Sequence, residues 1–345
     1  MKKIALIASC LGIASVSVFL LLCRDDAQVL VPTDIRLYAV QPEGNEESFD
    51  ILIGVLREER LYQDLSTELL RKDNIEDGYR DLLLNNSDLI IQNYSVAKEV
   101  LRELRALDSF EAIGDTSSSY DSEIVKFRSI RDLLQAVCFY TELSYIEDSK
   151  EKDLDELLQF HSIASNWLPY ARTLAHSMIS IVMLDRIRDT LLFVEPYLGP
   201  EEVQQVLTAY SDIPDYSRSI ENALYSEYCM TASALDGILA EGKGGLGFLL
   251  FKRNRTLNIY GSFLEEQISS ARVQDWDAMS KRSASLENDF KRIHLTNWGG
   301  WAFLSMTIPA INCVMQQAHE SHLKDVELVK NYNNLEVKTF SKNKK

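Results

Sequence analysis

The stretch DLDELLQFHSIASNWLPYARTLAHSMISIVML, residues 153–184, decides the fold class because it is long, central and apolar at helical spacing. Apolar residues on most faces of such a segment indicate a helix buried inside a domain. Asp153 and Glu156 have the spacing of a capping box at its start. Pro169 should kink or split the helix, since proline removes a backbone N–H. The apolar positions recur mostly every three or four residues: Leu157, Phe160, Ile163, Trp167, Leu168, Leu174, Met178, Ile181 and Leu184.

Helical periodicity continues on both sides of this stretch. From Phe49 onward we count roughly nine to eleven helical segments and almost no alternation of period two. Pro200 is expected at the first position of one helix. The helix over 213–239 should bury one side, formed by Ile220, Leu224, Tyr228 and Leu235. No repeat of fixed length is visible, so we predict an all-α, irregular multi-helix domain over 49–332.

The N-terminus predicts a membrane anchor. Lys2 and Lys3 precede residues 4–23, which carry no charge, and a helix of about 20 apolar residues spans a bilayer. We interpret 4–23 as an uncleaved signal anchor, because a cleaved signal peptide usually has a shorter apolar region. Ile7-Ala8-Ser9-Cys10 resembles a lipobox, so a lipoprotein or a cleaved signal stays an alternative. In each case most of the chain would lie outside the cytoplasm, in the periplasm of a bacterium.

The remaining boundaries follow from composition. We expect a cytoplasmic N-terminus over 1–3, the transmembrane anchor over 4–23, a linker over 24–48, the helical domain over 49–332 and a basic tail over 333–345. Residues 298–315 form a second uncharged zone, but Ser305, Thr307, Pro309 and Asn312 would be costly in lipid. A buried core helix is therefore expected there, with a second membrane contact as the alternative.

Composition narrows the function classes. The formal net charge is −16, and an acidic chain repels phosphate backbones, so no nucleic-acid partner is expected. The five cysteines show no CxxC or zinc-finger spacing, and the apolar neighbours of Cys138 and Cys229 indicate buried, inert thiols. No motif points to a cofactor, and none is expected.

Metal binding is the main enzymatic hypothesis. His319 and His322 are three positions apart in the sequence HESH, so one helix face can present both imidazoles to a metal. Asp325 and Glu327 are candidate further ligands. The other interpretation is a solvated polar helix face. His161 and His176, in the apolar stretch, are predicted to be core histidines.

The stretch EGKGGLGFLLFKRNRTLNIY, residues 241–260, combines glycines, an apolar run and basic residues. It lacks the pattern of a P-loop and no βαβ unit surrounds it, so it is not a nucleotide loop. The simplest interpretation is a helix end capped by Gly242, after which Asn254 or Thr256 caps the next helix. The alternative is contact with an anion or with anionic lipid. The residues that would make this contact are Lys243, Lys252, Arg253 and Arg255.

Four blocks carry a family resemblance: the anchor-like start, VPTD (31–34), FKRNRTLN (251–258) and NWGGWAFLSMTIPA (297–310). Together they resemble a set of uncharacterised, membrane-anchored, all-helical proteins of the bacterial envelope. The resemblance implies an all-α fold and assigns no residue a role. We therefore expect a non-enzymatic binding or assembly module at the inner membrane, with a protein or an anionic lipid as partner. The alternative is a metal-dependent hydrolase that uses His319 and His322.

Overall fold

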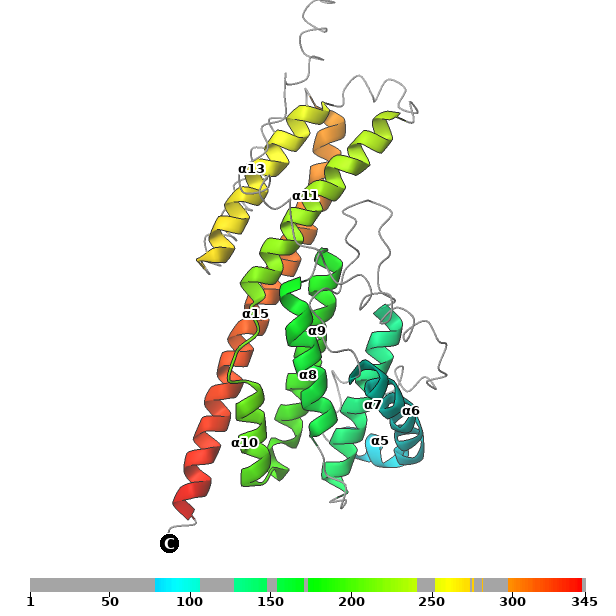
Figure 1. Ribbon diagram of the computed structural model, residues 1–345, viewed down its shortest axis with the longest axis vertical. Helices are drawn as coiled ribbons and strands as arrows, with labels where there is room; N and C mark the ends of the chain where they lie inside the picture. The colour runs from blue at the N-terminus through cyan, green and yellow to red at the C-terminus, as the bar shows by residue number, and fades with distance from the viewer. Residues whose placement is uncertain are drawn as a thin grey trace, which may run out of the picture. The chain divides into compact units, whose positions relative to one another are not determined.

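The computed structural model describes residues 78–105, 127–147, 154–170, 173–240, 252–273, 275, 281 and 297–342. Within these ranges the chain forms nine α-helices and two short 3₁₀ helices without a strand, which confirms the all-α prediction (Figure 1). The predicted anchor, the linker and Lys243 lie outside the described residues. In the described ranges, none of the helices combines the length and apolar character needed to cross a bilayer.

The chain divides into two compact units. In its described parts, the first unit contains the second half of α11 (Tyr216–Ala240), α13 (Arg253–Arg272) and the start of α15 (Trp298–Lys342). The second unit contains the remainder of α11 and α15 together with α5 (Tyr79–Asn85), α6 (Ser87–Arg105), α7 (Phe127–Ile146), α8 (Asp155–Trp167), η2 (Leu168–Tyr170), α9 (Leu174–Val194), η3 (Glu195–Tyr197) and α10 (Pro200–Ala209).

Helix α9 is the core helix of the second unit, and both α7 and α8 pack on it. Its buried side chains lie on most of its faces, as the sequence predicted. The split at Pro169 is also confirmed: α8 ends at Trp167, a 3₁₀ turn follows, and α9 begins at Leu174. The capping box predicted from Asp153 and Glu156 depends on Asp153, which lies outside the described residues; α8 itself begins at Asp155, and Leu154 before it makes no side-chain cap. The real cap in this region is Thr173, whose Oγ1 accepts the N–H of His176 at 3.1 Å.

In the first unit, the second half of α11, α13 and the start of α15 form a group of three helices (Figure 1). Leu224, Tyr228 and Leu235 of α11 are buried, as predicted. The helix predicted over 298–315 is the first part of α15, and it is amphipathic. One side is buried, formed by Leu304, Ile308, Ile311, Val314 and Met315, whereas Ser305 and Pro309 are exposed.

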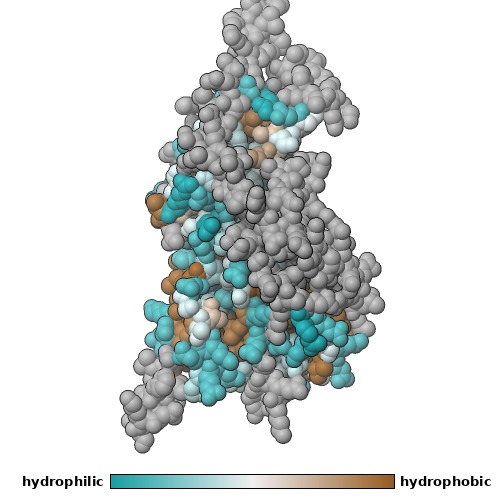
Figure 2. Space-filling model, viewed as in Figure 1, coloured by the Kyte–Doolittle hydropathy of each residue, from teal (hydrophilic) through white to brown (hydrophobic). Residues whose placement is uncertain are grey.

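Helix α15 continues as one helix of 45 residues through Lys342, where the sequence predicted a separate tail. On the face that Figure 2 shows, the described residues are mostly hydrophilic, with separate hydrophobic patches between them. The exposed large apolar side chains are correspondingly scattered over several helices: Leu84, Ile91, Val182, Leu192, Tyr197, Val273, Leu323 and Val326.

Candidate functional site

The two sequence blocks FKRNRTLN and NWGGWAF meet at the N-termini of α13 and α15. Asn297 is fully buried, and its Oδ1 accepts the N–H of Lys252 at 2.8 Å and the N–H of Gly300 at 3.3 Å. Its Nδ2 donates to Thr256 Oγ1 at 2.9 Å. The Asn297 side chain therefore caps the N-terminus of α15 and also binds the backbone of Lys252, the residue directly before α13. It joins the starts of two helices, although Lys252 and Asn297 are 45 positions apart in the chain.

The bond to Lys252 corrects the cap predicted for α13. The sequence pointed to Asn254 or Thr256, but the helix begins at Arg253 with Lys252 as N-cap. Thr256 instead donates its hydroxyl proton to Lys252 O at 2.7 Å, from inside the first turn. The cap comes from outside the local sequence, which is why local reasoning missed it.

Gly300 allows this close approach. A Cβ atom added at Gly300 would lie 2.2 Å from Thr256 Oγ1 and 2.3 Å from Asn297 Nδ2. Both distances are far below van der Waals contact, so a larger residue would push the two helix ends apart. The second glycine of the WGGW sequence is thus required by packing.

Three of the four predicted basic contact residues lie where the N-termini of α13 and α15 meet at Asn297, a place called the Asn297 corner below. Lys252 is the N-cap of α13, and Arg253 and Arg255 lie in its first turn. Arg253 forms a two-bond ion pair with Asp236 of α11, at 2.5 and 2.8 Å. Lys252 is 3% exposed and Arg255 is half-buried. The fourth residue, Lys243, lies outside the described residues.

The predicted metal pair lies on α15 within the second unit. His319 and His322 are both half-buried, and the His322 ring meets the edge of the Tyr216 ring at 6.1 Å between centroids. Asp325, one candidate ligand, is fully buried and accepts from Arg188 Nη1 at 2.8 Å, while Glu327 is exposed. Across the described residues, no three His, Cys, Asp or Glu side chains gather where they could hold a metal ion.

The pair Arg188–Asp325 is the centre of a buried polar network that the sequence analysis missed. Arg188 also donates from Nη1 to Ser321 O at 3.2 Å and from Nη2 to Asp185 Oδ1. Tyr216 OH donates to Asp325 Oδ2 at 2.6 Å. Burial alone would lower the pKa of Arg188, but the two carboxylates outweigh it and raise that pKa, so Arg188 stays charged.

Asp185 extends the same network along α15. Its Oδ1 accepts from Ser321 Oγ at 2.6 Å and its Oδ2 from Gln317 Nε2 at 2.7 Å. Burial raises the pKa of Asp325, and the hydrogen bonds from Tyr216 and Arg188 limit that rise. Arg188, Tyr216, Ser321 and Asp325 are buried, and Asp185 and Gln317 are partly buried beside them, so the network fixes α9 against α15 and α11.

A second buried charge pair lies on another side of α9. Arg186 Nη2 is 3.0 Å from Glu142 Oε1 of α7, and both side chains are largely buried. Glu142 also accepts from Thr190 Oγ1 at 3.0 Å and from Tyr79 OH. Burial and the nearby Glu142 raise the pKa of Tyr79, which therefore stays protonated and donates.

Both pairs come from the sequence DRIRDT, residues 185–190, which begins directly after the apolar stretch. The signal that could have found them is the position of this charged run: apolar residues follow it at Leu191, Phe193 and Val194, so the helix continues. Charged residues that have apolar segments before and after them in the same helix are candidates for buried ion pairs.

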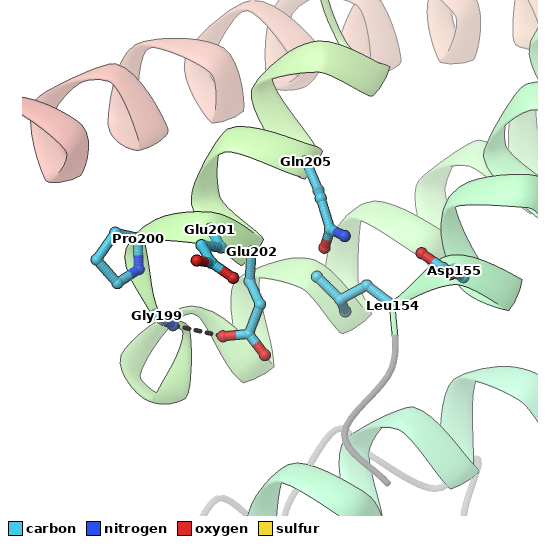
Figure 3. Close-up of a pocket in the computed structure, with 7 residues that line it drawn as sticks. All are labelled: Leu154, Asp155, Gly199, Pro200, Glu201, Glu202 and Gln205. Carbon is cyan, nitrogen blue, oxygen red and sulfur yellow. Dashed lines mark hydrogen bonds between the residues drawn. The ribbon is translucent and has the colours of Figure 1, made fainter.

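A surface pocket of about 500 Å³ lies beside the N-termini of α8 and α10 (Figure 3). Glu202 lines this pocket, and both of its carboxylate oxygens accept hydrogen bonds from the protein itself. Oε2 accepts the Gly199 N–H at 2.5 Å, and Oε1 accepts from Tyr145 OH at 2.8 Å. This is half of a capping box, since glycine has no side chain to complete it. The full lining is Leu154, Asp155, Gly199, Pro200, Glu201, Glu202 and Gln205.

The remaining predicted residues fall into place as core or surface groups. His161 and His176 are buried, as predicted. Cys138 is buried as well, whereas Cys229 and Cys313 are free thiols, half-buried and exposed respectively. The prediction of burial is therefore right for Cys138 and only partly right for Cys229.

Comparisons with protein-family models, with curated proteins and with solved structures each find no match to this chain. The resemblance to envelope proteins stays a prediction.

Proposed function

We propose that this protein is a non-enzymatic binding or assembly module, held at the bacterial inner membrane by residues 4–23, with its helices in the periplasm. The observation that supports it best is the Asn297 corner. It places three of the four predicted basic residues at one helix end: Lys252, which is buried, Arg253, which pairs with Asp236, and Arg255, which is half-buried. Side chains on an ordered helix end lose less conformational entropy on binding than side chains on a mobile loop.

The buried charged side chains of the second unit favour a binding function over catalysis, because they bond to one another. Arg188 and Asp325, the most buried opposite charges of the second unit, are bonded to each other and to neighbouring core groups. Catalytic groups must reach a substrate. These two side chains are 2% and 0% exposed, so their role in this proposal is to hold helices together.

The rival function, a metal-dependent hydrolase, depends on His319 and His322. Asp325 is committed to Arg188 at 2.8 Å, which removes one of its proposed ligands. Metal analysis of the purified full chain separates the two functions. The proposal expects well under one equivalent of zinc, iron or manganese per chain. One equivalent that disappears in a His319→Ala, His322→Ala double variant would decide for the hydrolase.

The placement at the membrane has its own test. The full chain, expressed in a bacterium, should stay in the membrane fraction after carbonate extraction, and protease added to spheroplasts should degrade the helical part. A variant with Leu20, Leu21 and Leu22 replaced by Lys should lose the attachment. Recovery of the full chain in the carbonate-soluble fraction would contradict the anchor.

A further inference from the structure

The C-terminal part of α15 has one buried side and one exposed side (red in Figure 1). Its inner side carries Ser321, Asp325, Leu328 and Tyr332, all of them buried. Tyr332 OH donates to Leu191 O of α9 at 2.9 Å, which fixes the rotation of the helix. The residues on the opposite side of the helix are therefore available to a partner.

Two large apolar residues lie next to each other on this exposed side. Leu323 is 52% exposed and Val326 is 43% exposed, and residues three positions apart share one face of a helix. Among the exposed large apolar side chains of the described residues, no other two are three or four positions apart in one helix. A single exposed apolar residue is ordinary, whereas an adjacent pair on one helix face is a candidate contact surface.

Charged residues of both signs surround this apolar pair. Glu320 and Glu327 supply two carboxylates, and Lys324 and Lys330 supply two ammonium groups. Glu320 is half-buried and the other three are exposed. The face is therefore neutral within a chain whose net charge is −16. Two copies of so acidic a chain repel each other in general, so a contact between copies needs a neutral surface of this kind.

The order of these residues is complementary to a second copy of the same helix that runs in the opposite direction. In a two-fold contact, two residues that meet across the axis meet twice. Leu323 against the partner's Val326 therefore implies Val326 against the partner's Leu323. At a rise of about 1.5 Å per residue, Lys324 then lies about 3 Å along the axis from the level of the partner's Glu327. Lys330 lies about 1.5 Å from the level of the partner's Glu320.

We propose that the face of α15 around Leu323 and Val326 binds a second copy of this chain, with the two helices antiparallel. A parallel pair would place Lys324 level with the partner's Lys324 and Glu327 level with the partner's Glu327, where like charges repel. The inference rests on the proposed assembly function and names its partner. Two apolar side chains per copy make a small contact, so we expect a Kd of about 1–100 µM.

Sedimentation velocity of the purified full chain in detergent, over about 1–200 µM, covers this range of Kd. Val326→Glu places a carboxylate in the apolar contact of both copies and should weaken the dimer at least about tenfold. Circular dichroism should show that the variant stays folded. Ile91→Glu is the matched control, because Ile91 of α6 is 44% exposed and lies on a different helix. It should keep the wild-type Kd.

Charge reversal tests the antiparallel pairing itself. In Lys324→Glu, and likewise in Glu327→Lys, the two positions meet across the axis with like charges. Each variant alone should therefore dimerise at least about tenfold more weakly than the wild type. An equal mixture of the two variants should form a heterodimer with nearly the wild-type Kd, since each contact between positions 324 and 327 again joins opposite charges. Such a recovery cannot come from misfolded variants.

A wild-type chain that stays monomeric over the whole concentration range overturns the inference, and this face would then serve a different protein or face solvent. An unchanged Kd in Val326→Glu overturns it as well, because the copies would then associate elsewhere. So does a mixture that dimerises no better than its two components. Metal content and membrane attachment do not depend on this face, so such a failure leaves the proposed function to its own tests.

Discussion

Arg188 and Asp325 lie 137 positions apart in the chain, yet Arg188 Nη1 donates to Asp325 Oδ1 at 2.8 Å in the interior of the second unit. Both side chains are almost fully buried. The pair therefore joins α9 to α15 at a place where an uncompensated charge could not be tolerated.

Removing one partner of this pair should be far worse than removing both. We expect Arg188→Met to lower the free energy of unfolding by about 3–5 kcal/mol, because Asp325 would be left buried and uncompensated. The double variant Arg188→Met, Asp325→Leu should recover most of that loss. Urea unfolding followed by circular dichroism measures both. Arg131→Met is the control, since Arg131 pairs with Asp132 at the surface and should change stability by less than about 1 kcal/mol. Equal losses in the single and double variants would contradict the argument.

Replacing Asn297 should lower the free energy of unfolding by more than the loss of an ordinary N-cap does. Asn297→Ala removes the acceptor of two backbone N–H groups, those of Lys252 and Gly300. We expect a loss of about 2–3 kcal/mol in the free energy of unfolding. Hydrogen exchange should show faster exchange of the Lys252 amide in particular. Asn333→Ala, at an exposed site on the same helix, should have almost no effect. Unchanged protection at Lys252 would count against the double cap.

Two glycines in helices should respond to alanine with opposite signs. Gly300→Ala should destabilise by about 1–3 kcal/mol, since its Cβ would overlap Thr256 and Asn297. Gly237→Ala should stabilise by about 0.5–1 kcal/mol, because nothing lies within 4 Å of its Cβ and alanine favours helix. Thermal unfolding of the two variants side by side measures the contrast. A stabilising Gly300→Ala would contradict the close packing of Thr256 and Asn297 against Gly300.

His161 should make the second unit sensitive to acid. Burial lowers its pKa from an ordinary 6.5 to about 4, so the unfolded chain binds a proton more readily than the folded one. Its contribution to stability is therefore complete above pH 6.5 and falls as the pH drops from 6.5 to about 4, by at most about 3 kcal/mol. In the wild type, the ring centroids of His161 and Tyr210 are 4.0 Å apart. His161→Phe keeps an aromatic ring there without a titrating group, so stability should change less with pH between 6.5 and 4. Denaturant midpoints at pH 7, 5.5 and 4.5 provide the test, and parallel profiles for the two proteins would contradict it.

The fold was predictable from the sequence where local patterns decide it. The period of the apolar residues gave the helices, Pro169 gave the break between α8 and α9, and Pro200 gave the start of α10. Burial of Ile220 and Leu235 on one side of α11 follows from the same spacing. These properties depend on neighbours a few positions away, and a single sequence contains that information.

The polar sites were not predictable because distant partners decide them. The apolar residues around Asp185, Arg186 and Arg188 mark them as candidates for burial, but their partners Glu142 and Asp325 lie on other helices far along the chain, where local patterns do not reach. The cap of α13 likewise comes from Asn297, 45 positions downstream. The basic cluster was visible as residue types, but the burial of Lys252 depends on how the helix ends meet.

The distance in sequence between Arg188 and Asp325 also sets a delay during protein synthesis. Arg188 leaves the ribosome 137 residues ahead of the carboxylate that neutralises it. At translation rates of about 5–20 residues per second, the guanidinium waits roughly 7 to 30 s for its partner. The second unit cannot close around α9 until α15 has been made, so a nascent chain truncated before α15 should be a substrate for chaperones and proteases.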